Sequence, residues 1–254
     1  MTVEFQCEPP TAVIVLHRPE AWNAITREMA HELASALDRF ESDPSLWVGI
    51  LAADGPAFSV GADLKSARSS DESAKPPRAG TLNPVLTRQR RKPLIAAVDG
   101  VAAGGGFELV LDCDLVVAST SARFVLPEVK WSLVAAAGGA MRLHQFLPRN
   151  VAMDLLLTGR ELTAAEAHRW GLVNRLVEPG GAREAAVAYA REVCRMGPVA
   201  VRETRRVLLE ATRPNEDQLW EASDDALAAA VAADDFEEGI RSFFEKRPPR
   251  WTGR

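Results

Sequence analysis

The sequence predicts an α/β protein in which strands and helices alternate at the N-terminal side and helices dominate the C-terminal third. Short β-branched apolar runs, separated by a long segment of helical periodicity, occupy the N-terminal part. From about residue 141 onward, one segment after another has apolar residues at helical spacing. The 254 residues, 47% of them hydrophobic and 26% charged, suffice for a full hydrophobic core.

Strands and a helix are expected to alternate along the N-terminal half. TAVIVLHRP (11–19) is a β-branched run that a proline ends, and LWVGILAA (46–53) is a second run. The residues between them, ITREMAHELASALDRFESD, have apolar side chains at helical spacing, with Thr26 at the start. KPLIAAVDG (92–100) and DLVVAS (114–119) are two more buried-looking strands. This order of strand, helix and strand implies a mostly parallel sheet.

Helices are expected through the remainder of the chain. NVAMDLLLTG (150–159) has helical spacing and a glycine at its end. TAAEAHRWG opens with Thr163 and has Glu166 three residues later, which is the pattern of a capping box. Longer segments with helical spacing follow at 181–198, 199–211 and 217–247.

Composition and charge argue against several classes of function. The net charge of −5 is spread along the chain, without the basic face of a nucleic-acid-binding protein. No apolar run reaches the roughly 18 residues of a membrane span, and the N-terminal MTVEFQCEPP lacks a signal core. We therefore expect a cytoplasmic protein with neither nucleic acid nor membrane as a partner. The three cysteines lie far apart and the four histidines lack paired-ligand spacing, so we expect no metal site.

The stretch GVAAGGGFELVLDCDL (100–115) places three glycines directly before a helix-favouring segment that carries Glu108. A helix N-terminus has free N–H groups and a partial positive charge, and glycines let a ligand oxygen approach them. The spacing is neither GxGxxG nor GxxxxGK[ST], which excludes the dinucleotide and P-loop interpretations. The run suits an oxygen that carries or develops negative charge, although tight packing of a helix on a sheet explains the glycines equally well.

Two further stretches add to the glycine run. AFSVGADLK again places small residues, Gly61 and Ala62, at an expected helix start, with Asp63 in the first turn. Two N–H donors from adjacent strand-to-helix turns would form an oxyanion hole around one carbonyl oxygen. FVLPEVK places Glu128 just beyond the fourth strand, twenty residues after Glu108. Two carboxylates near one polarised carbonyl can handle a water and a proton between them.

These stretches, taken together and in order, resemble the enoyl-CoA hydratase/isomerase (crotonase) superfamily. The resemblance covers essentially the whole chain and is carried by LHRPEAWNAI, AFSVGADLK, KPLIAAVDGVAAGGGFEL, PEVKWSLVAAAGGAMRL, LTGRELTAAEAHRWGLVNRLV and EEGIRSFFEKRPPRWTGR. It implies a crotonase-type ββα spiral core over residues 1–199. It also implies an α-helical region over residues 200–254 for oligomerisation and active-site cover, and a homotrimer or a dimer of trimers.

The resemblance further implies a substrate and residue roles. The substrate would be an acyl thioester of coenzyme A, so coenzyme A is part of the substrate and no cofactor is implied. The N–H groups of Ala62 and Gly105 would hold the thioester oxygen. Glu108 would take a proton from water and Glu128 would exchange the proton at C2, which favours hydration of the 2,3 double bond over plain isomerisation. Solvated surface carboxylates, the alternative, fit poorly with the apolar segments around both glutamates.

By the same likeness, several residues would line the path of the coenzyme A moiety. Near the adenine and pantetheine path these are Arg18, Trp22, Ala62, Asp63, Leu64 and Lys65. Phe243 and Lys246 in RSFFEKR would reach the nucleotide from a neighbouring subunit, or would belong to an amphipathic interface helix. The polar segment 66–83 is either a mobile surface loop or a lid over the acyl end of the substrate.

The stretch PEVKWSLVAAAGG departs from many members of the superfamily. It has Ser132 in place of a glycine, and Trp131 is bulky for its position near the acyl chain. Ala135, Ala136 and Ala137 would form a small apolar wall without a polar anchor. An acyl group without polar substituents is therefore expected, and long fatty chains are in doubt if Trp131 points inward.

Three functions stay open at this point. The first is an enoyl-CoA hydratase. The second is a related lyase or isomerase on a specialised acyl-CoA, such as a carnitinyl-CoA dehydratase, since GGGFEL and EKRPPRWTGR resemble those enzymes as well. Such an enzyme needs a partner for a quaternary ammonium, and Trp131 is the candidate. The third is a non-catalytic acyl-CoA-binding protein, against which the two glutamates argue.

Overall fold

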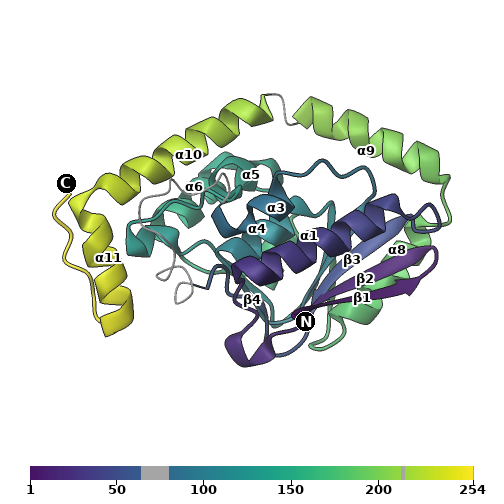
Figure 1. The fold of residues 1–254 in the computed structure, drawn as a ribbon, viewed down its shortest axis with the longest axis horizontal. Helices are drawn as coiled ribbons and strands as arrows, with labels where there is room; N and C mark the ends of the chain where they lie inside the picture. The colour runs from purple at the N-terminus through teal and green to yellow at the C-terminus, as the bar shows by residue number, and fades with distance from the viewer. Residues whose placement is uncertain (64–79, 213–214, 254) are drawn as a thin grey trace.

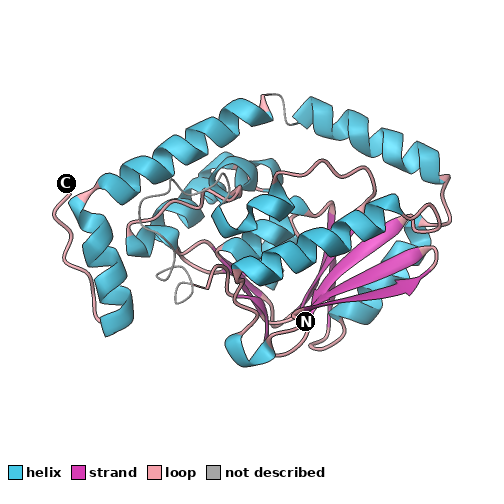
Figure 2. Ribbon diagram, viewed as in Figure 1, coloured by secondary structure: helices cyan, strands magenta, loops and turns pink. Residues whose placement is uncertain are grey.

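The computed structural model of the protein describes residues 1–63, 80–212 and 215–253. Its larger sheet has the strand order β1 (Val3–Glu8), β2 (Thr11–Leu16), β3 (Val48–Ala53), β5 (Leu94–Val98), β7 (Leu115–Ser119) and β10 (Arg175–Val177). β1 pairs with β2 in antiparallel fashion, and each later pair of neighbours is parallel (Figure 2). The prediction of a mostly parallel sheet is confirmed.

A smaller sheet takes one strand from each successive unit of the chain. Its order is β4 (Ala57–Ser59), β6 (Val101–Ala103), β8 (Arg123–Val125) and β9 (Leu162–Thr163). β5 leads into β6 and helix α4 (Gly105–Asp112), and β7 leads into β8 and helix α5 (Gly139–Phe146). The chain therefore winds as a spiral of strand–strand–helix turns. The turn between β5 and β6 needs a glycine, because Gly100 has φ +71° and a Cβ there would collide with the Pro56 carbonyl.

Helices α1 (Arg27–Ser42) and α8 (Ala182–Val193) cover opposite faces of the larger sheet. β2 is buried along its whole length, and its side chains alternate between the two faces. Ile14 and Leu16 belong to the core cluster that contains the buried face of α1, whereas Val13 and Val15 pack with the alanines of α8. The buried face of α1 is the one that the sequence predicts, and Thr26 caps it by accepting a hydrogen bond from the Met29 N–H (3.1 Å).

The remaining helices before the C-terminal region are short. They are α3 (Asn83–Leu86), α6 (Arg149–Thr158), α7 (Ala164–Arg169) and the 3₁₀ helices η1 (Pro19–Ala21), η2 (Gly80–Leu82) and η3 (Glu128–Trp131). The predicted capping box at the start of α7 is confirmed, because the Thr163 and Glu166 side chains each accept a hydrogen bond from the other residue's backbone N–H. No helix within the described ranges is long and apolar enough to cross a membrane.

Helices α9 (Pro198–Thr212), α10 (Glu216–Ala232) and α11 (Asp234–Glu245) form an arc around one side of the molecule (Figure 1). We call these helices the C-terminal arc. α11 turns back and packs closely on η3, since a Cβ on Gly239 would collide with the Trp131 carbonyl. The end of the chain is therefore held beside the segment that carries Glu128.

The structure corrects three expectations about local structure. The helical pattern over 217–247 is two helices, because Ala233 is extended (ψ 147°) and the acidic residues that follow it start α11. The C-terminal third also contains β9 and β10, strands of two and three residues that are too short to show a periodic pattern. Ala62 lies in a β-bridge with Ile25, and Asp63 is not helical, although it was expected in the first turn of a helix; the residues after Asp63 are outside the described ranges.

Candidate active site

Two backbone turns meet at the N-terminus of α4. One leads from β6 into α4 through Gly104 and Gly105, and the other follows β4 through Gly61 and Ala62. Their backbones are in van der Waals contact. A Cβ on Gly61 would lie only 2.8 Å from the Gly105 nitrogen, and a Cβ on Gly105 would lie 3.7 Å from the Ala62 nitrogen. The structure thus brings together the two residues whose N–H groups are candidates for an oxyanion hole.

The β-bridge of Ala62 fixes the direction of its N–H group. The Gly61 carbonyl accepts a hydrogen bond from Ile25 (2.7 Å), and the Asp63 N–H donates to the Ile25 carbonyl (3.0 Å). Successive N–H groups of an extended chain point to opposite sides, so the Ala62 N–H points away from Ile25. Among the described residues, neither the Ala62 N–H nor the Gly105 N–H donates a hydrogen bond to the protein. Two rigid, unused donors therefore lie side by side.

The three glycines of the run have different surroundings. A Cβ on Gly106 would collide with the Ser59 carbonyl, so this glycine allows α4 to pack on β4. A Cβ on Gly105 would meet only the end of the Leu82 side chain at 3.0 Å, besides the facing turn. A Cβ on Gly104, which has φ +51°, would lie 3.0 Å from Glu128 Oε1. Helix packing explains Gly106, whereas Gly104 and Gly105 face the candidate site.

Glu108 lies on α4, and 3% of its surface is exposed. Its Oε1 accepts a hydrogen bond of 2.8 Å from the N–H of Gly139, the first residue of α5. A Cβ on Gly139 would lie 3.0 Å from the same oxygen, so a larger residue would press on the carboxylate. The start of one helix thereby holds the carboxylate of another.

Glu128 is the first residue of η3, directly after the proline that ends the β8 segment. Its Oε2 is buried and has no hydrogen-bond partner among the described residues. A buried carboxylate oxygen without a partner is costly and is rarely kept for stability alone. Its position against the Gly104 turn directs it into the same space as Glu108.

Both carboxyl groups are harder to ionise than an ordinary glutamate. Burial raises the pKa of Glu108, and the nearby Glu128 carboxylate raises it further, against hydrogen bonds from Gly139 and Ala137 and the charge of Arg142. Burial also raises the pKa of Glu128. Two like charges in one buried space favour a state in which the pair retains a proton. Such a pair contains an acid and a base at the same time.

A cavity of about 620 Å³ joins these groups. Glu108, Glu128 and both backbone turns line it, together with Arg18, Trp22, Asp63, Trp131 and Phe243. Of the predicted alanine wall, Ala136 and Ala137 line the cavity, whereas Ala135 lies behind them against the Cβ position of Gly139. The Trp131 and Phe243 rings meet edge to face, with centroids 5.0 Å apart. Trp131 points toward the cavity, which is the condition under which the sequence put long fatty acyl chains in doubt.

The predicted coenzyme A contacts are placed only in part. Arg18 reaches the cavity with its Nη1 bonded to Asp63 Oδ2 (2.7 Å) and to the Ala24 carbonyl (3.0 Å). Leu64 and Lys65, and most of the polar segment 66–83, lie outside the described residues. Lys246 ends α11 with φ +53° and is not part of the cavity lining. Phe243 lines the cavity of its own chain, where a contact from a neighbouring subunit was expected.

Sequence reasoning missed several apolar residues of the lining. Leu82 lies beside Gly105, Leu133 and Val134 follow η3, and Leu227 comes from α10. Each is an ordinary leucine or valine in an apolar segment, and only the spiral and the arc bring them to one place. No local pattern of the sequence marks Leu227 or Phe243 as a cavity residue. In the described part of the chain, no group of three or more His, Cys, Asp or Glu side chains could hold a metal ion.

Comparison with known proteins places this geometry in a family. The pattern of the enoyl-CoA hydratase/isomerase family matches residues 8–254. Enoyl-CoA hydratase EchA19 of Mycobacterium tuberculosis is 38% identical over 96% of this chain and 94% of its own length. Mevalonyl-coenzyme A hydratase sidH of Aspergillus fumigatus is 39% identical over 96% and 92%.

A solved structure gives the same result for the fold. The crystal structure of carnitinyl-CoA hydratase from Mycobacterium avium superimposes with a TM-score of 0.92 at 36% identity, covering 100% of this chain and 99% of that one. The spiral of strand–strand–helix turns with its helical C-terminal region is therefore the crotonase fold. The chain belongs to the enoyl-CoA hydratase/isomerase family of the crotonase superfamily.

Proposed function

We propose that the protein is an enoyl-CoA hydratase, which adds water across the 2,3 double bond of an acyl-CoA thioester. One observation carries the proposal: two buried carboxyl groups of raised pKa share a cavity with two backbone N–H groups that donate to none of the described residues. Relatives that match nearly the whole chain are hydratases or dehydratases of CoA thioesters by name, which supports the same class of reaction. No cofactor takes part, because coenzyme A belongs to the substrate.

The thioester oxygen would lie between the N–H groups of Ala62 and Gly105. As water attacks C3, the electron pair of the double bond moves toward the thioester, and its oxygen gains negative charge. Each of the two donors stabilises this enolate by roughly 3–4 kcal/mol, because it is already oriented in a site shielded from water. The β-bridge at Ala62 and the helix start at Gly105 provide that orientation.

The two glutamates would each carry out one of the two proton transfers. Glu108, held by the Gly139 N–H, orients the water and accepts its proton as the oxygen bonds to C3. Glu128 gives a proton to C2, and the pair ends with the same number of protons as it began. A pair that retains one proton near neutral pH suits both roles.

We propose that Arg18, Trp22 and Asp63 border the path of the coenzyme A moiety, with Leu64 and Lys65 following them in sequence. Trp22 is half exposed and lines the cavity beside Arg18. Arg18 is held in place by Asp63, which orders its charge at the cavity wall. Lys246, at the end of α11, would contribute a further cation to the nucleotide.

The acyl group is proposed to be apolar and of limited length. Apart from Arg18, Asp63, Thr81 and the two glutamates, the described lining consists of glycines and of apolar and aromatic side chains, among them Leu133, Val134, Ala136, Ala137, Leu227 and Phe243. A second candidate function is dehydration of a carnitinyl-CoA, because Trp131 and Phe243 offer two aromatic faces to a quaternary ammonium. The described lining of the acyl end has no carboxylate besides Glu108 and Glu128, so the first candidate is favoured.

We further propose that the protein is cytoplasmic and forms a homotrimer or a dimer of trimers, with residues 200–254 at the contacts. α9 exposes Val199, Val207 and Leu208, each by more than half of its surface, and none of its residues is buried. Such an apolar face on a soluble chain is typical of a contact surface. Sedimentation at micromolar concentration tests this, and a monomer would contradict it.

The reaction is tested with a panel of enoyl-CoA thioesters of increasing chain length, with crotonobetainyl-CoA included. Loss of the conjugated thioester absorbance is followed, and the products are identified. Hydration of short, apolar substrates supports the main proposal, and preference for crotonobetainyl-CoA supports the second candidate. Tight binding without turnover of any substrate would indicate a non-catalytic acyl-CoA-binding protein.

A further inference from the structure

Helices α4 and α5 are joined by two polar contacts that lie one turn apart on both helices. The Gly139 N–H of α5 binds Glu108 Oε1 of α4 at 2.8 Å. Arg142 Nη1, three residues further along α5, binds Asp112 Oδ1, four residues further along α4, at 2.8 Å. Residues at these separations share a helix face, so both contacts belong to one interface. The register of α5 on α4 therefore determines where the Gly139 N–H meets the catalytic carboxylate.

Arg142 is the buried end of this interface. Only 2% of its surface is exposed, and its guanidinium bridges three elements of the fold. Besides Asp112, its Nη2 binds Glu216 Oε1 at the start of α10 (2.5 Å), and the group lies 5.2 Å from the ring centroid of Trp220. The planar fork thus ties α4, α5 and the C-terminal arc together at one point.

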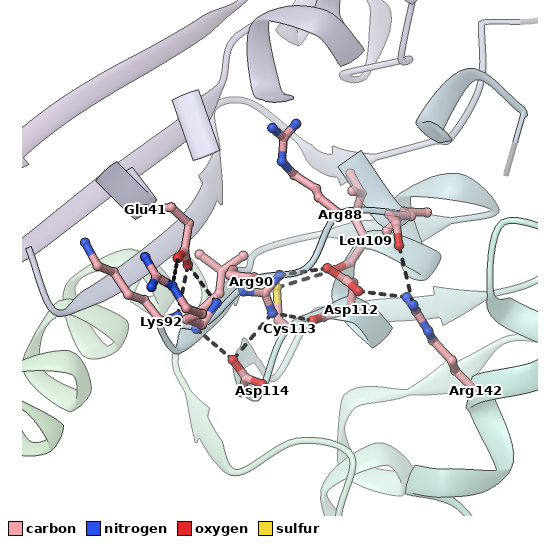
Figure 3. Close-up of polar contacts among 12 residues, drawn as sticks. Glu41, Arg88, Arg90, Lys92, Leu109, Asp112, Cys113, Asp114 and Arg142 are labelled. Atoms are coloured by element: carbon pink, nitrogen blue, oxygen red, sulfur yellow. Dashed lines mark hydrogen bonds and ion pairs between the residues drawn. The ribbon is translucent and has the colours of Figure 1, made fainter. Parts of the chain in front are cut away.

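A second buried arginine binds the same carboxylate from the other side. Arg90 Nη1 binds Asp112 Oδ2 at 2.8 Å, and Arg90 Nη2 binds the Asp112 carbonyl at 2.7 Å and reaches Asp114 at 3.4 Å (Figure 3). Arg90 lies on the segment before β5, and within the described residues its side chain makes no hydrogen bond or ion pair with α5. The two arginines carry the same charge and have side chains that are 6% (Arg90) and 3% (Arg142) exposed, but only Arg142 belongs to α5, the helix whose Gly139 N–H binds the Glu108 carboxylate.

We propose that Arg142 is a positioning residue for catalysis: by fixing α5 on α4, it keeps the Gly139 N–H on the Glu108 carboxylate. The inference rests on the proposed hydratase function. Arg142 does not line the cavity, and it acts through Gly139 and Glu108. Without the fork, the start of α5 is free to shift, and the carboxylate loses its fixed orientation toward the attacking water.

The charges around Glu108 set the expected pH dependence. Glu128 faces it from η3 and opposes its ionisation, and Arg142 on α5 favours it. β4 and β6, which also pack on α4, have no titratable side chain, while His144 of α5 and Lys130 of η3 are exposed. Asp112 lies on α4 itself, paired with both arginines. Loss of Arg142 therefore removes a cation that favours the Glu108 carboxylate. The acidic limb of the pH profile of kcat/KM, where activity rises with pH, then moves to higher pH.

The test compares Arg142→Gln and Arg142→Lys with the wild type in the hydration of an enoyl-CoA that the wild type turns over. For Arg142→Gln we expect kcat to fall on the order of 10²-fold, as for a displacement of about 1 Å in a catalytic geometry. KM changes little, because the coenzyme A path is untouched, and the acidic limb of kcat/KM shifts to higher pH. Arg142→Lys keeps the charge without the planar fork of the guanidinium. Compared with Arg142→Gln, it therefore brings the acidic limb closer to its wild-type position but recovers less of the wild-type kcat.

Arg90→Gln is the matched control. It removes an equally buried guanidinium from the other oxygen of Asp112, so it lowers the melting temperature in the same way. A purely structural role for Arg142 predicts the same kinetic behaviour for both variants. The proposal predicts that folded Arg90→Gln keeps the kcat and the acidic limb of the wild type.

The infrared band of protonated, buried carboxyl groups gives a readout that does not depend on hydration. Its titration moves to higher pH in Arg142→Gln and stays unchanged in Arg90→Gln if the proposal holds. If Arg142→Gln does not fold, the test uses Arg142→Lys and Asp112→Asn. Both variants disrupt the ion pair between residues 142 and 112 and keep a cation at position 142, and the proposal expects kcat to fall in both. Folded Arg142 variants with the kcat, acidic limb and carboxyl titration of the wild type overturn the inference. If the wild type hydrates no enoyl-CoA, the proposed function is wrong. The infrared titration does not depend on turnover, so it still tests the role of Arg142 in that case.

Discussion

The cavity of the candidate active site and the C-terminal arc hold their carboxylates in opposite ways. In the cavity, Glu108 and Glu128 are desolvated beside each other, and burial raises the pKa of both. At the end of the arc, Glu238 of α11 lies at the surface with its side chain 17% exposed, and it accepts hydrogen bonds from Arg247 (2.6 and 2.9 Å) and the Arg250 N–H (2.7 Å). These bonds lower the pKa of Glu238 to about 2.

The difference separates groups that serve the fold from groups that serve the chemistry. The bonds of Glu238 tie the final residues of the chain to α11, so its charge favours the folded state. Glu128 Oε2 has no hydrogen-bond partner among the described residues, and its burial opposes the charged form. A perturbed pKa that costs stability, at a cavity with unused N–H donors, is the pattern expected of a catalytic group.

The largest effect is expected when the cavity carboxylates are replaced. Glu108→Gln and Glu128→Gln each remove a positioned acid or base and leave the shape unchanged, so we expect kcat to fall by roughly 10²- to 10⁴-fold. Glu238→Gln is the matched change in the arc, and we expect its kcat to stay close to that of the wild type. Stopped-flow or steady-state hydration assays measure all three variants. Near-normal turnover by both cavity variants would remove the assigned mechanism.

The next effect distinguishes two neighbouring glycines of the run. Gly105→Val adds bulk that meets Leu82 and the facing turn, so we expect kcat to fall on the order of 10²-fold, as for loss of an oxyanion donor, in a protein that still folds. Gly106→Val puts its Cβ into the Ser59 carbonyl, so we expect it mainly to lower the melting temperature. Melting curves and kinetics on the same preparations measure both. A Gly105→Val protein that melts and turns over normally would argue against the oxyanion hole.

The two regions also differ in how far the sequence predicts them. Gly105, Ala62 and the two glutamates lie in short motifs next to strands, so their proximity follows once the strands are parallel neighbours. The long strands and α1 are visible because their apolar patterns span several residues. β4, β6 and β8 have three residues each, which is too short for a periodic pattern, and they define the smaller sheet.

The acyl side of the cavity was much less accessible from the sequence. Leu227 and Phe243 reach it only because Ala233 breaks the helix and α11 turns back onto η3. That return depends on the close contact of Gly239 with Trp131, a tertiary approach that no local pattern encodes. The buried partners of Asp112 are likewise far apart in sequence, so Arg142 carried no signal of its own.

A smaller effect is expected when the wall supplied by the arc is shortened. Phe243→Ala removes a ring that packs on Trp131 in the cavity, so longer acyl chains gain space. We expect kcat/KM for an acyl chain longer by a few carbons to rise about 10-fold relative to a short one, since one methylene in a pocket is worth roughly 1–3 kcal/mol. Phe244→Ala is the control, because the Phe244 ring meets the Phe243 ring edge to face and is not part of the lining. An unchanged chain-length profile in Phe243→Ala would show that the arc does not limit the acyl group.

The smallest effect is on stability, and it has opposite signs in the two regions. The pKa of Glu108 is raised in the folded state, so the stability it contributes is complete below its ordinary value of 4.5 and is lost as the pH rises. Glutamine cannot ionise, so we expect Glu108→Gln to melt higher than the wild type by a few degrees at high pH. The scale follows from a shift of roughly 2–4 °C for each kcal/mol in a chain of this size. This gain disappears as the pH falls below 4.5.

Glu238 is expected to behave in the reverse way. Its pKa is lowered to about 2, so its contribution is complete above the ordinary value of 4.5 and is lost as the pH falls toward 2. Glu238→Gln therefore melts lower than the wild type at neutral pH, and the two converge in acid. The loss is smaller than the gain in Glu108→Gln, because Glu238 lies at the surface with a partly exposed side chain and solvent screens its ion pair. Melting temperatures of the wild type and both variants from pH 3 to 9 measure how each difference in melting temperature depends on pH. If both variants melted lower than the wild type at high pH, the surroundings of Glu108 would stabilise its carboxylate. Its burial would then not oppose the charged form.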